Sequence, residues 1–126
     1  MLTTTTSTTE FKHKGLTHTQ LQQVLDYIQT HLDSAEPTLR ERDLSLAELA
    51  ETLNLSPTYF ATAFKQAINI SPHQYVIQQR VERAKLMLSK TDLAITDIAL
   101  QVGFSSQSHL NQQFKRLTGM TPKQIR

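Results

Sequence analysis

One pattern of residues occurs twice in this chain of 126 residues, and it restricts the possible folds more than any other feature. Segment 44–75 aligns with segment 93–125 at an offset of 49 residues, which becomes 50 after one inserted residue. Apolar residues recur at matching positions of the two segments. In order, Leu46, Leu49, Leu53, Phe60 and Phe64 correspond to Ile95, Ile98, Val102, Leu110 and Phe114. Two copies at this period are too few and too long for a tetratricopeptide array. The chain therefore contains an internal duplication of a helix–turn–helix–turn unit.

Turn and cap signals divide each copy into two short helices. Residues that tolerate the left-handed backbone conformation stand at the turns, namely Asn54 and Asn69 in the first copy and Gly103 and Gly119 in the second. Ser56 and Ser105 are predicted to cap the second helix of each copy. These second helices are expected at about 56–68 and 105–118, and the small residues Ala50 and Ala99 allow the first helices to pack closely.

The remaining chain also has helical patterning. Apolar residues at helical spacing predict an amphipathic helix before the first copy, and they are Leu21, Val24, Leu25, Ile28 and Leu32. Capping boxes are predicted at four helix starts, formed by Thr17 with Gln20, Ser45 with Glu48, Ser71 with Gln74 and Thr121 with Gln124. No alternating β pattern of useful length occurs. We therefore expect an all-α fold of about seven helices.

The two copies are predicted to form separate subdomains. Residues 1–14 are polar and of low complexity, and we interpret them as a disordered leader or the remnant of a linker. Residues 15–70 are expected to form the first helix-turn-helix subdomain, with a loop at 34–43, and residues 91–126 the second. A linker helix at 71–90 would join them and, at 1.5 Å per residue, would span roughly 28 Å. Successive major grooves on one face of B-DNA are about 34 Å apart, so one chain could place two helices in adjacent grooves.

Composition and charge exclude several classes of protein. The chain has no cysteine, so disulfides, thiolate metal sites and cysteine nucleophiles are excluded. No apolar run approaches the length of a membrane span, and no signal peptide is visible, so a cytoplasmic protein is expected. Residues 56–126 carry nine basic and three acidic side chains, a net charge of +6, whereas residues 1–55 have a net charge of −4. A basic half of this kind is compatible with a polyanionic partner.

The segment from about Gly15 to Arg126 resembles the DNA-binding domain of AraC/XylS-type transcription regulators. The resemblance rests on LSLAELAETLNLSPTYFATAFK, on RVERAKLML and above all on TDLAITDIALQVGFSSQSHLNQQFKRLTGMTPKQIR. It implies two homeodomain-like helix-turn-helix subdomains that bind double-stranded DNA, with this segment monomeric on DNA. It also implies a sequence-specific regulator, an activator that contacts RNA polymerase. Larger members of the family carry an additional N-terminal effector domain, whereas small members do not.

The resemblance also implies which residues contact DNA. Base-reading residues would face away from the apolar anchors, and they map to Thr58, Ala61, Thr62, Gln107, Ser108, Asn111 and Gln112. Phosphate contacts map to Lys65, Lys115 and Arg116 and to the helix starts at Ser56 and Ser105. Amide side chains can bond an adenine edge, and threonine or alanine can contact a thymine methyl group. Many relatives have arginine at the positions of Thr62 and Gln112, and its absence here favours weaker or more A·T-directed recognition.

Other functions are less consistent with the sequence. The five histidines are scattered without metal-ligand spacing, and no nucleophile–base pair is visible, so neither a metal, a cofactor nor an enzymatic activity is expected. Arg80 and Arg83 are expected to support the scaffold, through pairing with Glu82 or Asp97, rather than to bind DNA. The alternative hypothesis is a protein-interaction module of the same fold with weak DNA affinity, which acts through another regulator or RNA polymerase.

Overall fold

The computed structural model describes residues 15–33 and 44–126, and these residues form helices without any strand. The helices are α1 (His18–Leu32), α3 (Leu46–Thr52), α4 (Pro57–Ile68), α5 (Pro72–Lys90), α6 (Ile95–Gln101), α7 (Gln107–Thr118) and α8 (Pro122–Ile125). The predicted all-α fold of about seven helices is thus confirmed in the described part of the chain. The predicted leader at 1–14 and the predicted loop at 34–43 lie outside the described residues.

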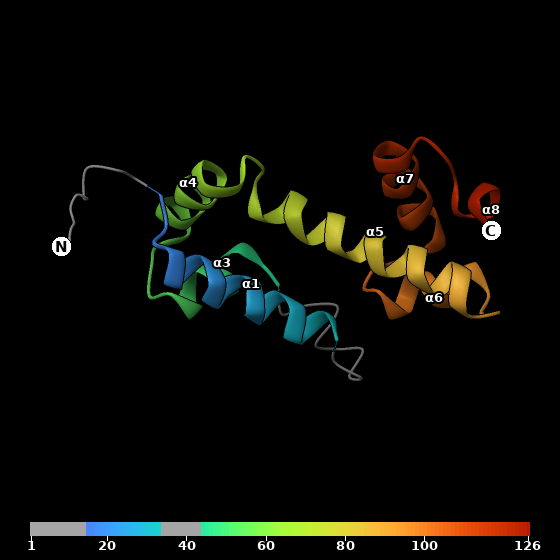
Figure 1. The fold of residues 1–126 in the computed structure, drawn as a ribbon, viewed down its shortest axis with the longest axis horizontal. Coiled ribbons are helices and arrows are strands. Elements are labelled where there is room, and N and C mark those ends of the chain that lie inside the picture. The colour runs from blue at the N-terminus through green and yellow to red at the C-terminus, as the bar shows by residue number, and fades with distance from the viewer. Residues whose placement is uncertain (1–14, 34–43) are drawn as a thin grey trace.

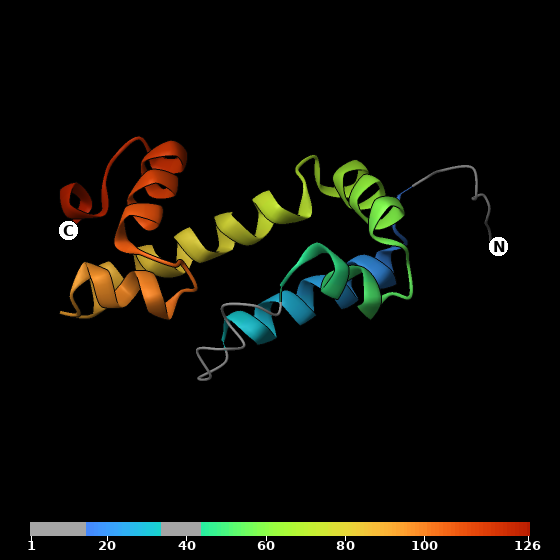
Figure 2. The same ribbon diagram turned by 180° about the vertical axis from the view of Figure 1, so that it is seen from behind.

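Helix α5 runs through the molecule and carries a group of helices near each end (Figure 1). Helices α1, α3 and α4 lie at its N-terminal end, and α6, α7 and α8 lie at its C-terminal end. In Figure 1 and in the reverse view of Figure 2, α4 and α7 lie on one side of α5, whereas α1, α3 and α6 lie on the other. The second helices of the two copies are therefore on the same side of the molecule.

Two apolar cores correspond to the two groups of helices. The first core contains the buried residues Val24, Ile28, Leu32, Leu49, Ala50, Leu53, Phe60, Phe64 and Val76. The second core contains the buried residues Ile77, Val81, Ala84, Leu88, Ile98, Ala99, Val102, Phe104, Leu110 and Phe114. The apolar residues predicted for the first helix thus lie in the first core or pack against it. Both cores include residues of α5, so this helix belongs to each of them.

The turns of the two copies close with the same hydrogen bonds. Between the paired helices, the Leu55 N–H donates to the Ala50 carbonyl at 3.1 Å, and the Phe104 N–H donates to the Ala99 carbonyl at 2.9 Å. The backbone φ is positive at all four predicted turn positions, with values of 57° at Asn54, 74° at Asn69, 104° at Gly103 and 83° at Gly119. The prediction of left-handed residues at these positions is confirmed.

Two of the four predicted capping boxes are complete. Thr17 with Gln20 and Thr121 with Gln124 make both reciprocal bonds. Ser45 and Ser71 accept the expected backbone N–H bonds of their helices. The second bond of each box, from the backbone N–H of the serine to the side chain of Glu48 or Gln74, is not formed. The side chain of Glu48 instead accepts the Tyr27 hydroxyl at 2.9 Å, and that of Gln74 accepts a bond from Arg116 at 2.9 Å. These two boxes were wrongly predicted because partners from distant helices compete for the same oxygen atoms.

The cap of α7 also differs from the prediction. Ser106, not Ser105, is the N-cap, and its side chain accepts the His109 N–H at 3.1 Å. Ser105 is exposed and precedes the helix. The residue inserted in the second copy accounts for the shift, since Ser106 lies 50 residues after Ser56 and three residues before His109, whose N–H it accepts. Ser105 is thus the residue inserted in the second copy, and Ser106 corresponds to Ser56.

The two adjacent serines provide a matched test of this cap. We expect Ser106→Ala to lower the free energy of unfolding by about 1 kcal/mol, because the His109 N–H loses its acceptor. Ser105→Ala should change it by less than about 0.5 kcal/mol. Urea unfolding followed by circular dichroism measures both variants. Equal losses, or a larger loss for Ser105→Ala, would contradict the assignment of the cap.

Candidate nucleic-acid interface

The two faces of α7 differ sharply in character. Leu110 and Phe114 are completely buried and hold the helix against the second core. The predicted base-reading residues of this helix are all on its exposed or half-buried surface, and they are Gln107, Ser108, Asn111 and Gln112. The helix contains no carboxylate, and its last turn carries Lys115 and Arg116. Its outer surface therefore offers amide and hydroxyl groups beside positive charge, a combination suited to base edges and phosphates.

Helix α4 is anchored in the same way but has a less polar surface. Phe60 and Phe64 are completely buried, and their rings contact each other at a centroid distance of 5.6 Å. Of the predicted base-reading residues, Thr58 and Thr62 are exposed and Ala61 is half-buried. The Thr62 hydroxyl donates to the backbone carbonyl of Thr58 at 3.2 Å. Since this bond uses the only proton of the Thr62 hydroxyl group, that group can serve a further partner only as an acceptor.

A hydrogen bond between the paired helices limits one predicted base-reading residue. The Thr96 hydroxyl on α6 donates to Gln107 Oε1 at 2.6 Å, which leaves the amide nitrogen of Gln107 to face outward. No pattern in the sequence singles out Thr96. The two residues are eleven positions apart on different helices, and no spacing rule connects them. In the first copy the corresponding residues are Ala47 and Pro57, which cannot form such a bond.

The predicted phosphate contacts include two lysines in equivalent positions. Lys65 on α4 and Lys115 on α7 are both exposed. Their carbonyl groups accept the N–H of the left-handed residue that ends each helix, with distances of 2.7 Å from Asn69 and 2.8 Å from Gly119. The two lysines therefore occupy the same place in the two copies. Within the described residues, neither ammonium group forms a hydrogen bond or an ion pair.

Arg116 is positioned differently from the two lysines. Its guanidinium donates to Gln113 Oε1 at 2.8 and 3.0 Å and to Gln74 Oε1 at 2.9 Å. Gln74 lies in the first turn of α5, so this arginine connects α7 with the linker helix. A phosphate contact by Arg116 would have to share donors with these bonds.

The two arginines of α5 act as scaffold, as predicted. Arg80 Nη1 donates to the Gly103 carbonyl at 3.1 Å, and burial lowers the pKa of Arg80. Arg83 forms an ion pair with Asp33 and donates to Gln29 Oε1 at 3.1 Å. The predicted partners of Arg83 were wrong, since it bonds to α1 and its C-cap residue rather than to Glu82 or Asp97.

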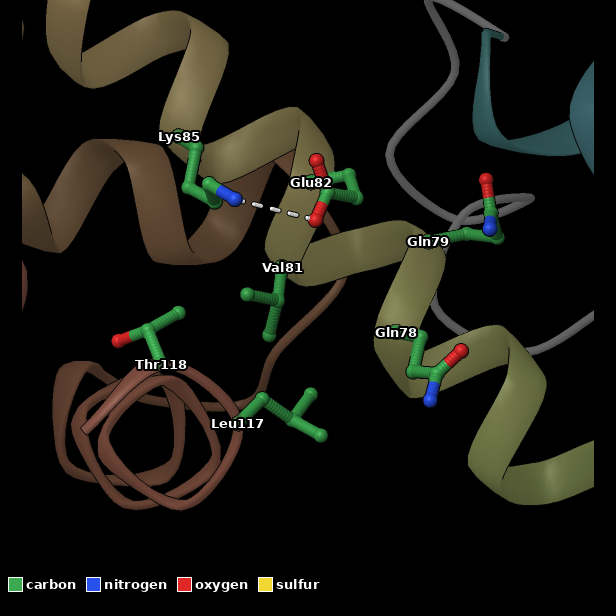
Figure 3. Close-up of a pocket in the computed structure, with 7 residues that line it drawn as sticks. All are labelled: Gln78, Gln79, Val81, Glu82, Lys85, Leu117 and Thr118. Carbon is green, nitrogen blue, oxygen red and sulfur yellow. Dashed lines mark hydrogen bonds and ion pairs between the residues drawn. The ribbon is translucent and has the colours of Figure 1, made fainter. Parts of the chain in front are cut away.

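Several other kinds of site are not formed by the described residues. Within residues 15–33 and 44–126, no group of three or more potential metal ligands comes together. None of the helices in this part of the chain combines the length and apolar character that crossing a bilayer requires. One hollow of the surface, shown in Figure 3, is lined by residues of α5 and α7.

Comparison with known proteins identifies related domains. A family model described as a helix-turn-helix domain matches residues 49–126. An uncharacterized HTH-type transcriptional regulator of Staphylococcus aureus is 40% identical over 107 residues, which cover 85% of this chain but only 13% of that regulator. The chain thus spans about an eighth of the length of these curated relatives. They are described as regulators and not as enzymes, which agrees with the prediction that the chain is not an enzyme.

Two solved structures of domains from other regulators have the same fold. The C-terminal domain of AraT, a response regulator from Geobacillus stearothermophilus, is 34% identical, with a TM-score of 0.74 over 85% of this chain and 83% of that chain. The DNA-binding domain of AdpA, solved in complex with a target DNA, is 27% identical, with a TM-score of 0.72 over 83% of this chain and 87% of that chain.

The neighbouring cations Lys115 and Arg116 provide a test of their different surroundings. Arg116→Ala should lower the free energy of unfolding by about 0.5–1.5 kcal/mol, because the bonds to Gln74 and Gln113 are lost. Lys115→Ala should leave it nearly unchanged. Urea unfolding in a low-salt buffer measures the difference. If the two variants were equally stable, the Arg116 bonds would not contribute to the fold.

Proposed function

The chain belongs to the AraC-type helix-turn-helix family, and from this membership we propose that it is a sequence-specific transcription regulator that inserts α4 and α7 into adjacent major grooves of one DNA duplex. The observation that carries the proposal is the position of α4 and α7 on the same side of α5, near its two ends (Figures 1 and 2). The 19 residues of α5 span roughly 28 Å, which is close to the repeat of about 34 Å between grooves.

In the proposed complex the two helices read DNA by different chemistry. On α7, Asn111 and Gln112 can each bond an adenine edge through oxygen and nitrogen together. Gln107 would act mainly as a donor, because Thr96 occupies its oxygen. On α4, Ala61 and the methyl groups of the threonines would contact thymine methyl groups. We expect the half-site of α7 to be the more stringent, and the half-site of α4 to be rich in A·T pairs.

Phosphate contacts would hold both helices in register. Lys65 and Lys115 are exposed at equivalent positions, and the helix starts at Ser56 and Ser106 would present backbone N–H groups to the DNA strands. This assignment replaces Ser105 with Ser106 as the capping residue beside the DNA. Arg116 would contribute its charge while it remains bonded to Gln74.

The regulatory role is proposed from family membership. We propose a cytoplasmic activator that binds as a monomer through this segment and contacts RNA polymerase. The rival function is an interaction module whose own DNA affinity is weak. It is favoured by one observation, namely that neither α4 nor the base-facing residues of α7 include an arginine. Arginine paired with guanine is the commonest specific base contact, so this domain lacks a common source of discrimination.

Selection from a random duplex library distinguishes these functions. The selected duplex and a scrambled duplex are then compared by fluorescence anisotropy at two salt concentrations. Two-groove reading by one chain predicts a split motif with half-sites one helical turn apart. The protein should bind this motif with much higher affinity than scrambled DNA. Enrichment of a single half-site would restrict base reading to one helix. Weak binding that salt abolishes, without enrichment, would favour the interaction module.

Substitution of the α7 amides tests base reading. We expect Gln112→Ala and Asn111→Ala to weaken binding to the selected site by roughly 1–3 kcal/mol each while binding to scrambled DNA is retained. The reason is that a base contact contributes only on the matching sequence. Competition binding against a set of single-base variants measures the change. Equal loss on every sequence would refute the base-reading role of the substituted residue.

Substitution of the lysines tests the phosphate contacts. We expect Lys115→Ala to weaken binding on all sequences alike, because phosphates are present at every site. For the unmodified protein with about six phosphate contacts, the slope of log K against log salt should be about −5, and Lys115→Ala should reduce it by about 1. Anisotropy titrations at four salt concentrations measure both slopes. Lys123→Ala, on the short helix α8, serves as a control of equal charge.

A further inference from the structure

A group of four polar residues ties α1 to the middle of α5. Arg83 on α5 pairs with Asp33, the C-cap residue of α1, and donates to Gln29 Oε1 at 3.1 Å. Gln29 Nε2 in turn donates to Gln79 Oε1 at 2.9 Å, one turn earlier on α5. We refer to Gln29, Asp33, Gln79 and Arg83 as the α1–α5 polar cluster. It joins the first group of helices to α5 one to two helical turns beyond their apolar contact at Val76.

The same part of α5 is bound to the second group of helices. Arg80 lies between Gln79 and Arg83 and donates to the carbonyl of Gly103 at 3.1 Å, in the turn that precedes α7. Figure 3 shows that Gln79 points away from Leu117 and Thr118 of α7. The short segment 79–83 is therefore attached to α1 by Gln79 and Arg83 and to the turn before α7 by Arg80.

The angle between the two groups of helices has a large effect on the separation of α4 and α7. A rotation of α5 by about 10° about its N-terminal end moves its far end, roughly 28 Å away, by about 5 Å. The rise along DNA is about 3.4 Å for each base pair. Since α7 packs beside Val81, about half-way along α5, such a change of angle would displace α7 by roughly 2–3 Å relative to α4, which is most of the rise of one base pair.

We infer that the α1–α5 polar cluster is a positioning device that selects the spacing between the two half-sites, with Arg83 as its central residue. The inference rests on the proposed insertion of α4 and α7 into one duplex. Without the cluster, the first group of helices is held to α5 through the apolar contacts at its N-terminal end, including Val76 and the ring contact of Phe64 with Tyr75. Rotation about this contact changes the separation of α4 and α7 while both cores remain intact.

Stability alone does not reveal such a role. An ion pair with one exposed partner contributes little to the free energy of unfolding. Asp33 is 63% exposed, so its substitution leaves both cores undisturbed. The informative measurement is therefore the dependence of DNA binding on half-site spacing, which a residue that only stabilises the fold would not alter.

The test uses the full chain and a series of duplexes in which the two selected half-sites are moved apart or together by one or two base pairs. We expect the unmodified protein to bind its best spacing about tenfold more tightly than spacings that differ by one base pair. Arg83→Met retains most of the apolar stem but removes the charge and the donors. It should reduce this preference to about threefold or less, mainly through weaker binding at the best spacing.

Three comparisons make the result specific. Asp33→Asn should reduce the preference in the same direction, and Arg83→Lys should restore part of it, because the ammonium group keeps the ion pair but cannot reproduce the guanidinium geometry. Lys85→Met is the matched control, since Lys85 pairs with Glu82 at 3.2 Å within α5 itself (Figure 3) and cannot tie α5 to α1. It should retain the full spacing preference. Binding of Arg83→Met to a duplex with the α7 half-site alone should equal that of the unmodified protein.

The outcomes separate this inference from the proposed function. If Arg83→Met retained the tenfold spacing preference, the positioning role would be overturned while two-groove binding stood. A loss of binding to the single half-site as well would identify a general folding defect, and would also overturn the positioning role. If the unmodified protein showed no spacing preference, two-groove insertion would be refuted, and the inference with it.

Discussion

Two adjacent residues of α5 are buried in different cores, and the arrangement of the whole structure depends on this sharing. Val76 belongs to the first core and Ile77 to the second. Successive residues of an α-helix point in directions about 100° apart, so the two cores contact α5 on different sides. The first core contacts its N-terminal part, whereas the second begins beside it at Ile77 and extends along the helix to Leu88. Small domains bury a low fraction of their surface and are marginally stable. A helix common to both cores supplies each of them with apolar surface that its own copy lacks.

The features that the sequence predicted correctly are local or periodic. The turn residues have positive φ because a short connection between two helices requires it, and asparagine and glycine reach that conformation at low cost. Burial of Phe60, Phe64, Leu110 and Phe114 follows from helical periodicity, which also places the other face of each helix toward solvent. For the candidate site, the sequence thus predicted which side chains are exposed on α4 and α7, while their roles toward DNA remain predictions.

The errors arose where several groups compete for one partner. Ser105 and Ser106 are both suitable caps and compete for one position. The inserted residue shifts the second copy by one, so only the alignment of Ser106 with Ser56 distinguishes the two serines. Glu48 and Arg83 have partners on distant helices, Tyr27 and Asp33, which local spacing cannot indicate. The bond between Thr96 and Gln107 could not be predicted for the same reason, since it joins two different helices.

The proposed base-reading surfaces of α4 and α7 contain no arginine, so binding of DNA would depend more strongly on the geometry of α5. When two weak sites are joined in one chain, binding of the second becomes intramolecular, and the gain is lost if the connection does not match the distance between the sites. A domain with strong contacts in each groove tolerates some mismatch between the separation of its helices and the separation of the grooves, because either helix alone retains affinity for DNA. In the proposed complex α4 offers mainly methyl groups and α7 mainly amides, so neither helix alone would retain much affinity for DNA. The specificity of such a domain would then depend on the rigid separation of its two helices as much as on the residues that face the bases. The polar contacts that attach segment 79–83 to both groups of helices are placed where they can hold that separation.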